Sequence, residues 1–479
     1  MPVSSTRPLR ASPLFAAVRA EFALPVGFPA AVLAEAAAAA DRPPVDGPGR
    51  VDATDLELVT IDPPGSKDLD QALGVVRRDH GFRVHYAIAD LGRVVVPGGA
   101  LDEEARRRGQ TIYLPDGSVP LHPPVLSEAA ASLLPDGPRA AVLWTIDLDD
   151  TAEPVSVDVR RAVVRSRARL DYAGVQADVD AGRVHPAVAA LPELGPLRRA
   201  HAVRRGAVEL ELPEQEVVPD GAGGWTLRAR RRLDVEAWNA EISLLTGMAA
   251  GRIMLDAGIG LLRTLPAPEP PALETFRRAT RELGFAWAPG ASAAEVLAGL
   301  PADDPAALAV RRAATTLLRG AGYAAFDREA GVPPPDDAGH GGIGAPYAHV
   351  TAPLRRLADR FCTELCLAVT AGAEPPAWVR EALPLLPDVM AESDAFAAKV
   401  DRACLDRAEA ALLAGCLGEE FEAVALRPGG AEGEPGEIYV PDPPVLARCT
   451  GALTAGAVVR VRLVAAEAAT GRIEFVAVS

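Results

Sequence analysis

The segment that most constrains this chain covers residues 59–73, where an apolar stretch leads into three aspartates. The aspartates are Asp62, Asp68 and Asp70. The Pro-Pro-Gly sequence after Asp62 ends the predicted strand, because proline lacks the backbone donor that a strand needs. Asp68 and Asp70 are two residues apart, so in an extended segment they lie on one face. We therefore expect the loop to fold both carboxylates back toward Asp62.

Three carboxylates that converge on one point repel one another unless a cation neutralises them. Ligation by oxygen atoms alone suits Mg²⁺, with Mn²⁺ as the alternative ion. The pattern therefore predicts a metal centre held by the three aspartates. A solvated acidic loop that follows a strand is the other interpretation of the same residues.

The composition limits the possible classes of protein. The chain has 479 residues, 49% of them hydrophobic, and a net charge of −16. This charge argues against a general nucleic-acid binder, although a local basic channel is compatible with it. We expect no membrane span and no signal peptide, because no apolar run approaches eighteen residues. Five cysteines without a CxxC pair indicate free thiols, no disulfide and a cytoplasmic protein.

The periodicity of apolar residues predicts a β-rich part that is followed by a helix-rich part, which begins near residue 160. This order favours an α+β fold over a doubly wound sheet. Strands are predicted at 56–61, 82–88 and 141–148, and in the tail at 437–440, 458–464 and 472–478. Helices are predicted at 15–24, 30–40, 101–109, 235–249, 273–284, 305–320, 353–370 and 393–414, and a linker at 428–435.

A second dense segment is rich in glycine and precedes the predicted helix at 353–370. Pro353 suits a first helical turn with Thr351 as its N-cap, and a helix N-terminus favours an anion. Arg355 and Arg356 then lie in the first turn, where one can bind a phosphate through two hydrogen bonds. Asp359 is spaced to hold one of these arginines. An ordinary capped helix with a surface ion pair is the alternative.

A carboxylate metal site combined with an arginine that binds phosphate implies metal-assisted phosphoryl chemistry, with a phosphodiester as the natural substrate.

At these two segments the chain resembles the ribonuclease II (RNB) family of processive 3′→5′ exoribonucleases. The motif TID-x5-D-x-D occupies residues 60–70, and Y-x-H-x-T-A-P-x-R-R occupies residues 347–356. Shorter motifs at 87–90, 108–115 and 120–127 occur in the family's order. The resemblance covers residues 50–415 and adds a weaker likeness to an S1/OB-type β-barrel in the tail.

The resemblance implies an RNB-type catalytic domain at 51–418, in which a mixed sheet packs with helices. A helical lead at 1–50 would precede it, and a small C-terminal β module at 419–479 would follow it. It implies that Asp62, Asp68 and Asp70 bind the metal, with Asp70 the least replaceable.

The resemblance also assigns residues that contact the substrate. It implies that Arg355 contacts the scissile phosphate and that Arg356 supports it or binds an adjacent phosphate. Tyr113 would stack on the 3′-terminal base. Tyr172 would lie near the ribose, and Glu236 would read the 2′-hydroxyl that separates RNA from DNA. Without the family context both tyrosines would be read as core or rim residues.

The same motif places His349 among the RNA-binding residues. Five positions depart from the family pattern, and two of them are Ala352 in place of the usual serine and Leu357 in place of a usual tyrosine. Gln71 stands where the family usually has a fourth aspartate, and its carbonyl oxygen is a candidate neutral metal ligand. Ser243 falls where asparagine is frequent, and Leu210 falls where an aromatic clamp is expected.

The cold-shock domains that normally precede the catalytic domain do not fit into about fifty residues, so we expect reduced RNA-anchoring surfaces and low processivity. The leading hypothesis is a monomeric, metal-dependent exoribonuclease that degrades single-stranded RNA to nucleoside 5′-monophosphates. A catalytically weak or inactive RNB-fold protein that binds RNA or a partner is the alternative. A phosphodiesterase acting on DNA or small nucleotides is a third reading.

Overall fold

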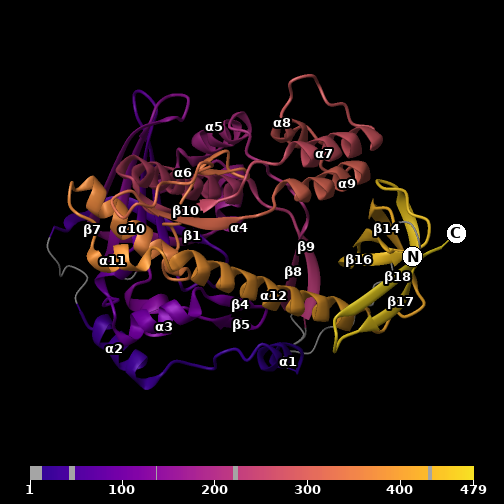
Figure 1. The fold of residues 1–479 in the computed structure, drawn as a ribbon, viewed down its shortest axis with the longest axis horizontal. Helices are drawn as coiled ribbons and strands as arrows, with labels where there is room; N and C mark the ends of the chain where they lie inside the picture. The colour runs from indigo at the N-terminus through magenta and orange to yellow at the C-terminus, as the bar shows by residue number, and fades with distance from the viewer. Residues whose placement is uncertain (1–12, 43–48, 136, 220–224, 430–433, 479) are drawn as a thin grey trace.

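The computed structural model describes residues 13–42, 49–135, 137–219, 225–429 and 434–478. Its first half is built on a closed barrel of five strands (Figure 1). These strands are β1 (Val51–Asp62), β2 (Gln71–Arg77), β3 (Phe82–Ala89), β6 (Arg139–Leu148) and β7 (Pro154–Asp171). The barrel is mixed, because β1 runs parallel to β7 while the other pairs of neighbouring strands in the barrel are antiparallel.

Three long helices organise the rest of the body. They are α6 (Asp234–Ala257), α10 (Leu357–Thr370) and α12 (Leu386–Leu413). Helix α10 packs against α6 and β7, and the main core joins barrel and helix side chains such as Trp144, Leu245 and Phe361. Burial of these apolar side chains is the main force that holds the helices on the barrel.

A second closed barrel forms the C-terminal module, and α12 runs from the body to it (Figure 1). Its strands are β14 (Glu420–Arg427), β15 (Gly436–Pro441), β16 (Pro444–Thr450), β17 (Val458–Glu467) and β18 (Arg472–Ala477). The core of this barrel includes Phe475 and contacts Leu413 of α12. The guanidinium of Arg312 adds two hydrogen bonds of 2.7 and 2.8 Å to Glu437.

Shorter elements complete the chain. The helices are α1 (Pro13–Glu21), α2 (Ala30–Ala40), α3 (Ala100–Arg108), α4 (Tyr172–Asp180), α5 (Leu191–Arg204), α7 (Pro270–Glu282), α8 (Ala293–Ala298), α9 (Pro305–Ala314) and α11 (Ala377–Ala382). The strands are β4 (Ile112–Leu114), β5 (Gly117–Val119), β8 (Glu214–Pro219), β9 (Trp225–Arg230), β10 (Ile259–Thr264), β11 (Gly322–Asp327), β12 (Gly339–His340) and β13 (Ala345–Pro346).

The α+β class and the small β-barrel predicted for the tail are confirmed. The expected start of the helix-rich part near residue 160 is wrong, because β7 continues to Asp171 and pairs with β1 and β6. The predicted linker at 428–435 falls partly on residues 430–433, outside the described residues. Among the described helices, none combines the length and the apolar character needed to cross a membrane.

Candidate metal and phosphate site

The acidic segment, residues 62–70, leads from the end of β1 to β2, and hydrogen bonds with Ser132 hold its backbone in place. Asp62 is the last residue of β1 and is paired with Asp171 of β7. The Ser132 hydroxyl accepts a hydrogen bond from the Leu69 amide at 3.0 Å and donates one to the Lys67 carbonyl at 2.6 Å. These two bonds bracket Asp68 and fix the backbone that presents both loop aspartates.

Asp70 is the carboxylate that joins the two sequence motifs. It is 4% exposed, and its Oδ1 accepts a hydrogen bond of 2.7 Å from the Leu354 amide. Its Oδ2 lies 3.3 Å from Nε of Arg355, whose side chain is nearly half exposed. Burial raises the pKa of Asp70 to about 8 despite this arginine, and burial raises the pKa of Asp62 to about 6.

Burial is the main cause of both raised pKa values, and the positive charge of Arg355 offsets it only in part. The negative charge of Asp68 adds to the rise at both Asp62 and Asp70. Oxygen donors with excess negative charge fit a hard divalent cation such as Mg²⁺ or Mn²⁺. The donor chemistry of this segment therefore fits the metal that the sequence predicts.

The three carboxylates do not, however, form a ready-made ligand cage. Across the described ranges, no group of three acidic, histidine or cysteine side chains converges in metal-binding geometry. Asp68 instead accepts a hydrogen bond of 2.9 Å from the Tyr113 hydroxyl, while Asp70 lies beside Arg355. Asp68 and Asp70 are paired with these two groups, so the expected convergence of the three carboxylates on one point is not seen among the described residues.

Both the nitrogen and the oxygen of the Gln71 side-chain amide form hydrogen bonds within the protein. Its Nε2 donates to the Thr351 carbonyl at 2.7 Å, and its Oε1 accepts from the Tyr86 hydroxyl at 2.6 Å. The same hydroxyl lies 2.6 Å from Oγ of Ser243. This geometry directs the Gln71 amide to the segment before the arginines, so the expectation of a metal ligand at Gln71 finds no support in it. Tyr86 was not identified from the sequence.

The arginine motif forms a turn and not the first turn of a helix. The backbone amides of Arg355 and Arg356 bond to the Ala352 carbonyl at 3.2 and 3.0 Å, and α10 begins only at Leu357. Thr351 is therefore not the N-cap, and the predicted helix start is wrong. The physical reason is that Asp359, from within α10, accepts the Ala352 amide at 2.7 Å and fixes the turn.

The two arginines have different surroundings. Nε and an Nη of Arg356 donate to the two oxygens of the fully buried Asp359 at 2.6 and 2.8 Å. The predicted arginine–aspartate pair is thus confirmed. This pair occupies Nε and one Nη of Arg356, which favours the supporting role over a contact with an adjacent phosphate, and the place of Arg356 among the RNA-binding residues stays a prediction. Arg355 keeps an accessible guanidinium beside Asp70.

One stripe of helix α6 faces the site. Glu236, Asn239 and Ser243 are spaced by three and four residues, which places them on one helical face. Asn239 donates to the Tyr172 hydroxyl at 3.3 Å, and Ser243 contacts Tyr86. Burial is the main cause of the raised pKa of Tyr172, and the negative charges of Asp62 and Glu236 add to it, so both carboxylates lie near this tyrosine. Asn239 was missed, although polar residues at this spacing were a usable signal.

The remaining predicted residues divide into exposed and enclosed ones. Tyr113 is 50% exposed, as stacking on a base requires. Glu236 is 8% exposed, and both its oxygens accept from one Nη of Arg230 at 2.6 and 2.5 Å. Nδ1 of His349 lies 2.8 Å from the Tyr323 hydroxyl, and burial lowers the pKa of His349 well below its ordinary value. His349 is therefore held neutral inside an aromatic cluster, which does not support the predicted RNA contact.

Comparison with known proteins identifies the family. The model of the RNB domain matches residues 50–370. This chain belongs to the RNB family. The model of the RNase II-type exonuclease C-terminal S1 domain matches residues 419–478. The resemblance to this family and the S1-type tail inferred from the sequence are thus confirmed.

Two curated relatives are each 31% identical to the chain within the aligned segments. It is 31% identical to exosome complex exonuclease RRP44 homolog A of Arabidopsis thaliana over 68% of this chain and 36% of that protein. It is also 31% identical to ribonuclease R of Escherichia coli over 70% of this chain and 42% of that protein. The chain therefore matches less than half the length of these relatives.

Solved structures show the same fold at lower identity. Mycoplasma genitalium RNase R in complex with ribose methylated single-stranded RNA matches with a TM-score of 0.85 and 20% identity, over 97% of this chain and 77% of that chain. The structure of yeast Ssd1, a pseudonuclease, matches with a TM-score of 0.70 and 18% identity, over 84% and 50% of the two chains. The fold is therefore shared by proteins described as nucleases and by one described as a pseudonuclease.

Proposed function

We propose that this chain is a metal-dependent 3′→5′ exoribonuclease that hydrolyses single-stranded RNA to nucleoside 5′-monophosphates. One observation carries this proposal. The guanidinium of Arg355 is exposed and lies beside Asp70, the Leu354 amide bonds directly to Asp70, and the charge of Asp68 adds to the burial that raises the pKa of Asp62 and Asp70. Membership of the RNB family supports the same reading.

The three aspartates would hold Mg²⁺, or Mn²⁺, through their carboxylate oxygens. When bound, such an ion supplies an activated water and stabilises the leaving oxygen. Arg355 neutralises charge on the phosphate, because its guanidinium lies beside Asp70 and is exposed enough to meet a ligand. The bond from Leu354 to Asp70 keeps the phosphate-binding and acidic segments in register.

Two groups of side chains bind the nucleotide. The exposed ring of Tyr113 stacks on the terminal base, and its hydroxyl bond to Asp68 brings that base to the carboxylates. Tyr172 and Glu236 read the ribose, since a carboxylate can accept a hydrogen bond from the 2′-hydroxyl that DNA lacks. Gln71 acts as a tether between the acidic and arginine segments.

The C-terminal barrel gives weak anchoring for long RNA. Arg460 and Arg462 pair with Glu420, and Arg472 pairs with Glu474, so these cations are already partly neutralised. Phosphate binding depends on cations that are available to replace counterions. We propose a catalytic unit at 51–418, a helical lead at 1–50 and a barrel at 419–479, in a cytoplasmic monomer that degrades RNA with low processivity.

A catalytically silent RNA-binding protein is the second candidate. The neutral Gln71 in the acidic segment and the fold shared with the pseudonuclease Ssd1 favour it. The presence of the three aspartates, Tyr113 and Arg355 favours activity, because carboxylates with raised pKa values, such as Asp62 and Asp70, are typical of functional sites.

The direction and products of cleavage test the proposal. RNA labelled at its 5′ end and single-stranded at its 3′ end is incubated with Mg²⁺ or Mn²⁺, beside DNA of the same sequence. We expect labelled products that shorten from the 3′ end and nucleoside 5′-monophosphates in the chromatogram. Internal cleavage, or equal degradation of the DNA, would contradict the proposed function.

A further inference from the structure

Arg230 is the centre of a charge cluster on the β8–β9 hairpin. It is the last residue of β9 and is paired with Glu214 of β8. Its guanidinium contacts three carboxylates, because Glu214 and Glu216 lie at 2.7 and 2.6 Å in addition to both oxygens of Glu236. The first two carboxylates are about half exposed, whereas Glu236 is nearly buried. Arg230 thus connects the hairpin to the inner face of α6.

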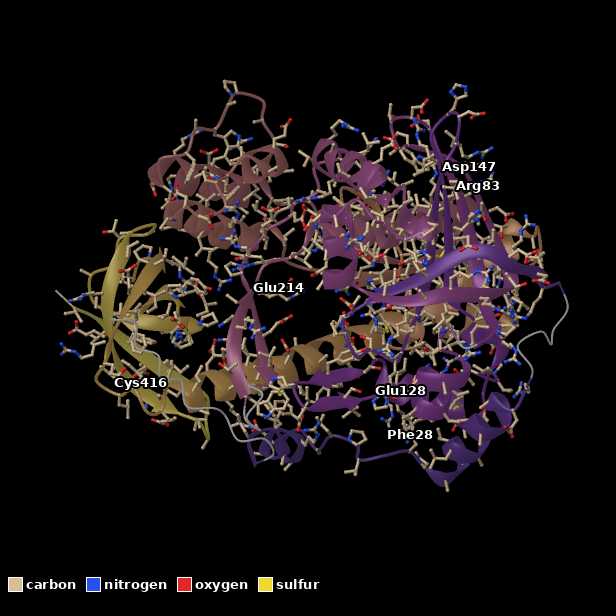
Figure 2. The ribbon with its side chains drawn as sticks, turned by 180° about the vertical axis from the view of Figure 1, so that it is seen from behind. Phe28, Arg83, Glu128, Asp147, Glu214 and Cys416 are labelled. Atoms are coloured by element: carbon tan, nitrogen blue, oxygen red, sulfur yellow. The ribbon has the colours of Figure 1, made fainter. Side chains whose placement is uncertain are left out.

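The opposite side of the hairpin is attached to the C-terminal barrel. Figure 2 labels Glu214 on this hairpin, which lies between the body and the barrel. Nε2 of Gln215 donates to the Pro444 carbonyl of β16 at 2.8 Å and to Glu409 of α12 at 2.5 Å. Leu227 of β9 belongs to the apolar core of the barrel. The position of Arg230 is therefore fixed by a folded hairpin rather than by a free loop.

The cluster determines which hydrogen bonds Glu236 can form. The contact of Arg230 with both oxygens holds the Glu236 carboxylate in one orientation, in which it offers acceptor oxygens to a ligand. One Nη of Arg230 binds both oxygens, and each carboxylate oxygen has a second lone pair that remains available for a ligand. One turn further along α6, Asn239 holds the Tyr172 hydroxyl on the same face.

We propose that Arg230 is a specificity-determining positioning residue, which fixes the Glu236 carboxylate as the acceptor for a ribose 2′-hydroxyl. The proposal rests on the proposed function, since it assumes that RNA enters this site. A deoxyribose leaves the fixed acceptor without a partner, and a buried polar group without a partner disfavours binding. The hairpin that carries Arg230 would thus contribute to the choice of RNA over DNA without touching the reacting phosphate.

The test compares specificity rather than activity alone. The ratio of kcat/KM is measured for an RNA and for the same RNA with one 2′-deoxy nucleotide, placed in turn at each of the last four positions. The variants are Arg230→Met, Arg230→Lys and Glu236→Gln. Arg232→Met is the matched control, because Arg232 follows the same hairpin and pairs with Glu209 at 2.7 Å, away from Glu236.

We expect Arg230→Met to reduce the discrimination at one position by about 10- to 100-fold, the value of a hydrogen bond to a charged group. Arg230→Lys keeps the positive charge but loses the planar guanidinium with its several donors. Its discrimination should therefore lie between those of the wild-type protein and Arg230→Met. Arg232→Met should retain the wild-type ratio. In the Glu236→Gln background, Arg230→Met should cause no further loss.

The outcomes separate the two proposals. The role of Arg230 would be overturned if Arg230→Met lowered kcat/KM equally on the RNA and the 2′-deoxy substrate. In that case the folded Arg230→Lys protein would also keep the wild-type ratio of the two kcat/KM values. A wild-type protein that degrades no RNA would instead overturn the proposed function on which this inference rests.

Discussion

Replacing Gln71 by alanine is the most informative single perturbation of the site. The substitution removes the bond from Nε2 to the Thr351 carbonyl at 2.7 Å and the bond from the Tyr86 hydroxyl to Oε1 at 2.6 Å. Thr351 lies three residues before Leu354, whose amide binds Asp70. The change therefore loosens the connection between the acidic segment and Arg355.

The size of the effect follows from these contacts. Each buried group that loses its partner costs about 1–3 kcal/mol. Tyr86 retains its contact with Ser243, so the cost at that hydroxyl is at the low end. We expect Gln71→Ala to lower the free energy of unfolding by about 2–4 kcal/mol in chemical denaturation, from a total of about 5–15 kcal/mol. Misplacement of Arg355 should lower kcat by about 10- to 100-fold.

The glutamate variant separates a tether from a metal ligand. Gln71→Glu keeps an acceptor for Tyr86 but places a carboxylate against the Thr351 carbonyl. A tether predicts that activity falls as in Gln71→Ala and does not recover at high Mg²⁺ or Mn²⁺. A metal ligand predicts that half-maximal activity needs less metal, because a negative charge is added.

The assay is a metal titration of the initial rate of RNA hydrolysis, run beside chemical denaturation. Gln176→Ala is the control, since Gln176 donates to Asp180 at 3.0 Å and accepts from Val235 at 3.2 Å, outside the acidic segment. It should lose stability without a change in the metal midpoint. Tighter metal dependence in Gln71→Glu with full activity would refute the tether.

Three further outcomes are expected. Asp359→Asn should lower the free energy of unfolding by about 3–5 kcal/mol because it leaves Arg356 without its buried partner, whereas Asp256→Asn at an exposed pair should change it by less than about 1 kcal/mol. The pKa of Asp70 is raised from 3.8 to about 8, so the folded state binds the extra proton. Without divalent metal, stability should therefore fall as the pH rises from about 4 to 8, and Asp70→Asn should remove most of this slope in thermal unfolding. A long RNA in excess over enzyme should give a ladder of intermediates; its disappearance without intermediates would contradict low processivity.

Local patterns allowed much of this molecule to be predicted. The proline pair after Asp62 ends β1 where expected, and the alternation of apolar residues placed β3 within one residue. The Arg356–Asp359 pair was also predictable, because three residues of spacing suffice to bring the two side chains together. The ordered motifs identified the family, since several weak matches in one order are specific.

Contacts between distant segments could not be predicted. Thr351 and Pro353 have the composition of a helix start, but Asp359 bonds to the Ala352 amide and delays the helix to Leu357. The Gln71 amide bonds to a carbonyl 280 residues away, so its sequence neighbours suggested a metal ligand instead. Arg230 lies only six residues before Glu236, yet no pattern marked it among the many arginines of this chain.

The most direct test of the central claim is the rate of RNA hydrolysis by the wild-type protein and by Asp70→Asn at equal RNA occupancy. Occupancy is matched by a binding titration in EDTA, and the reaction is started with Mg²⁺ or Mn²⁺. The catalytic account predicts rapid loss of nucleotides from the 3′ end that Asp70→Asn abolishes. RNA that binds to both proteins and is cleaved by neither would contradict it and identify the chain as a silent RNA-binding member of the family.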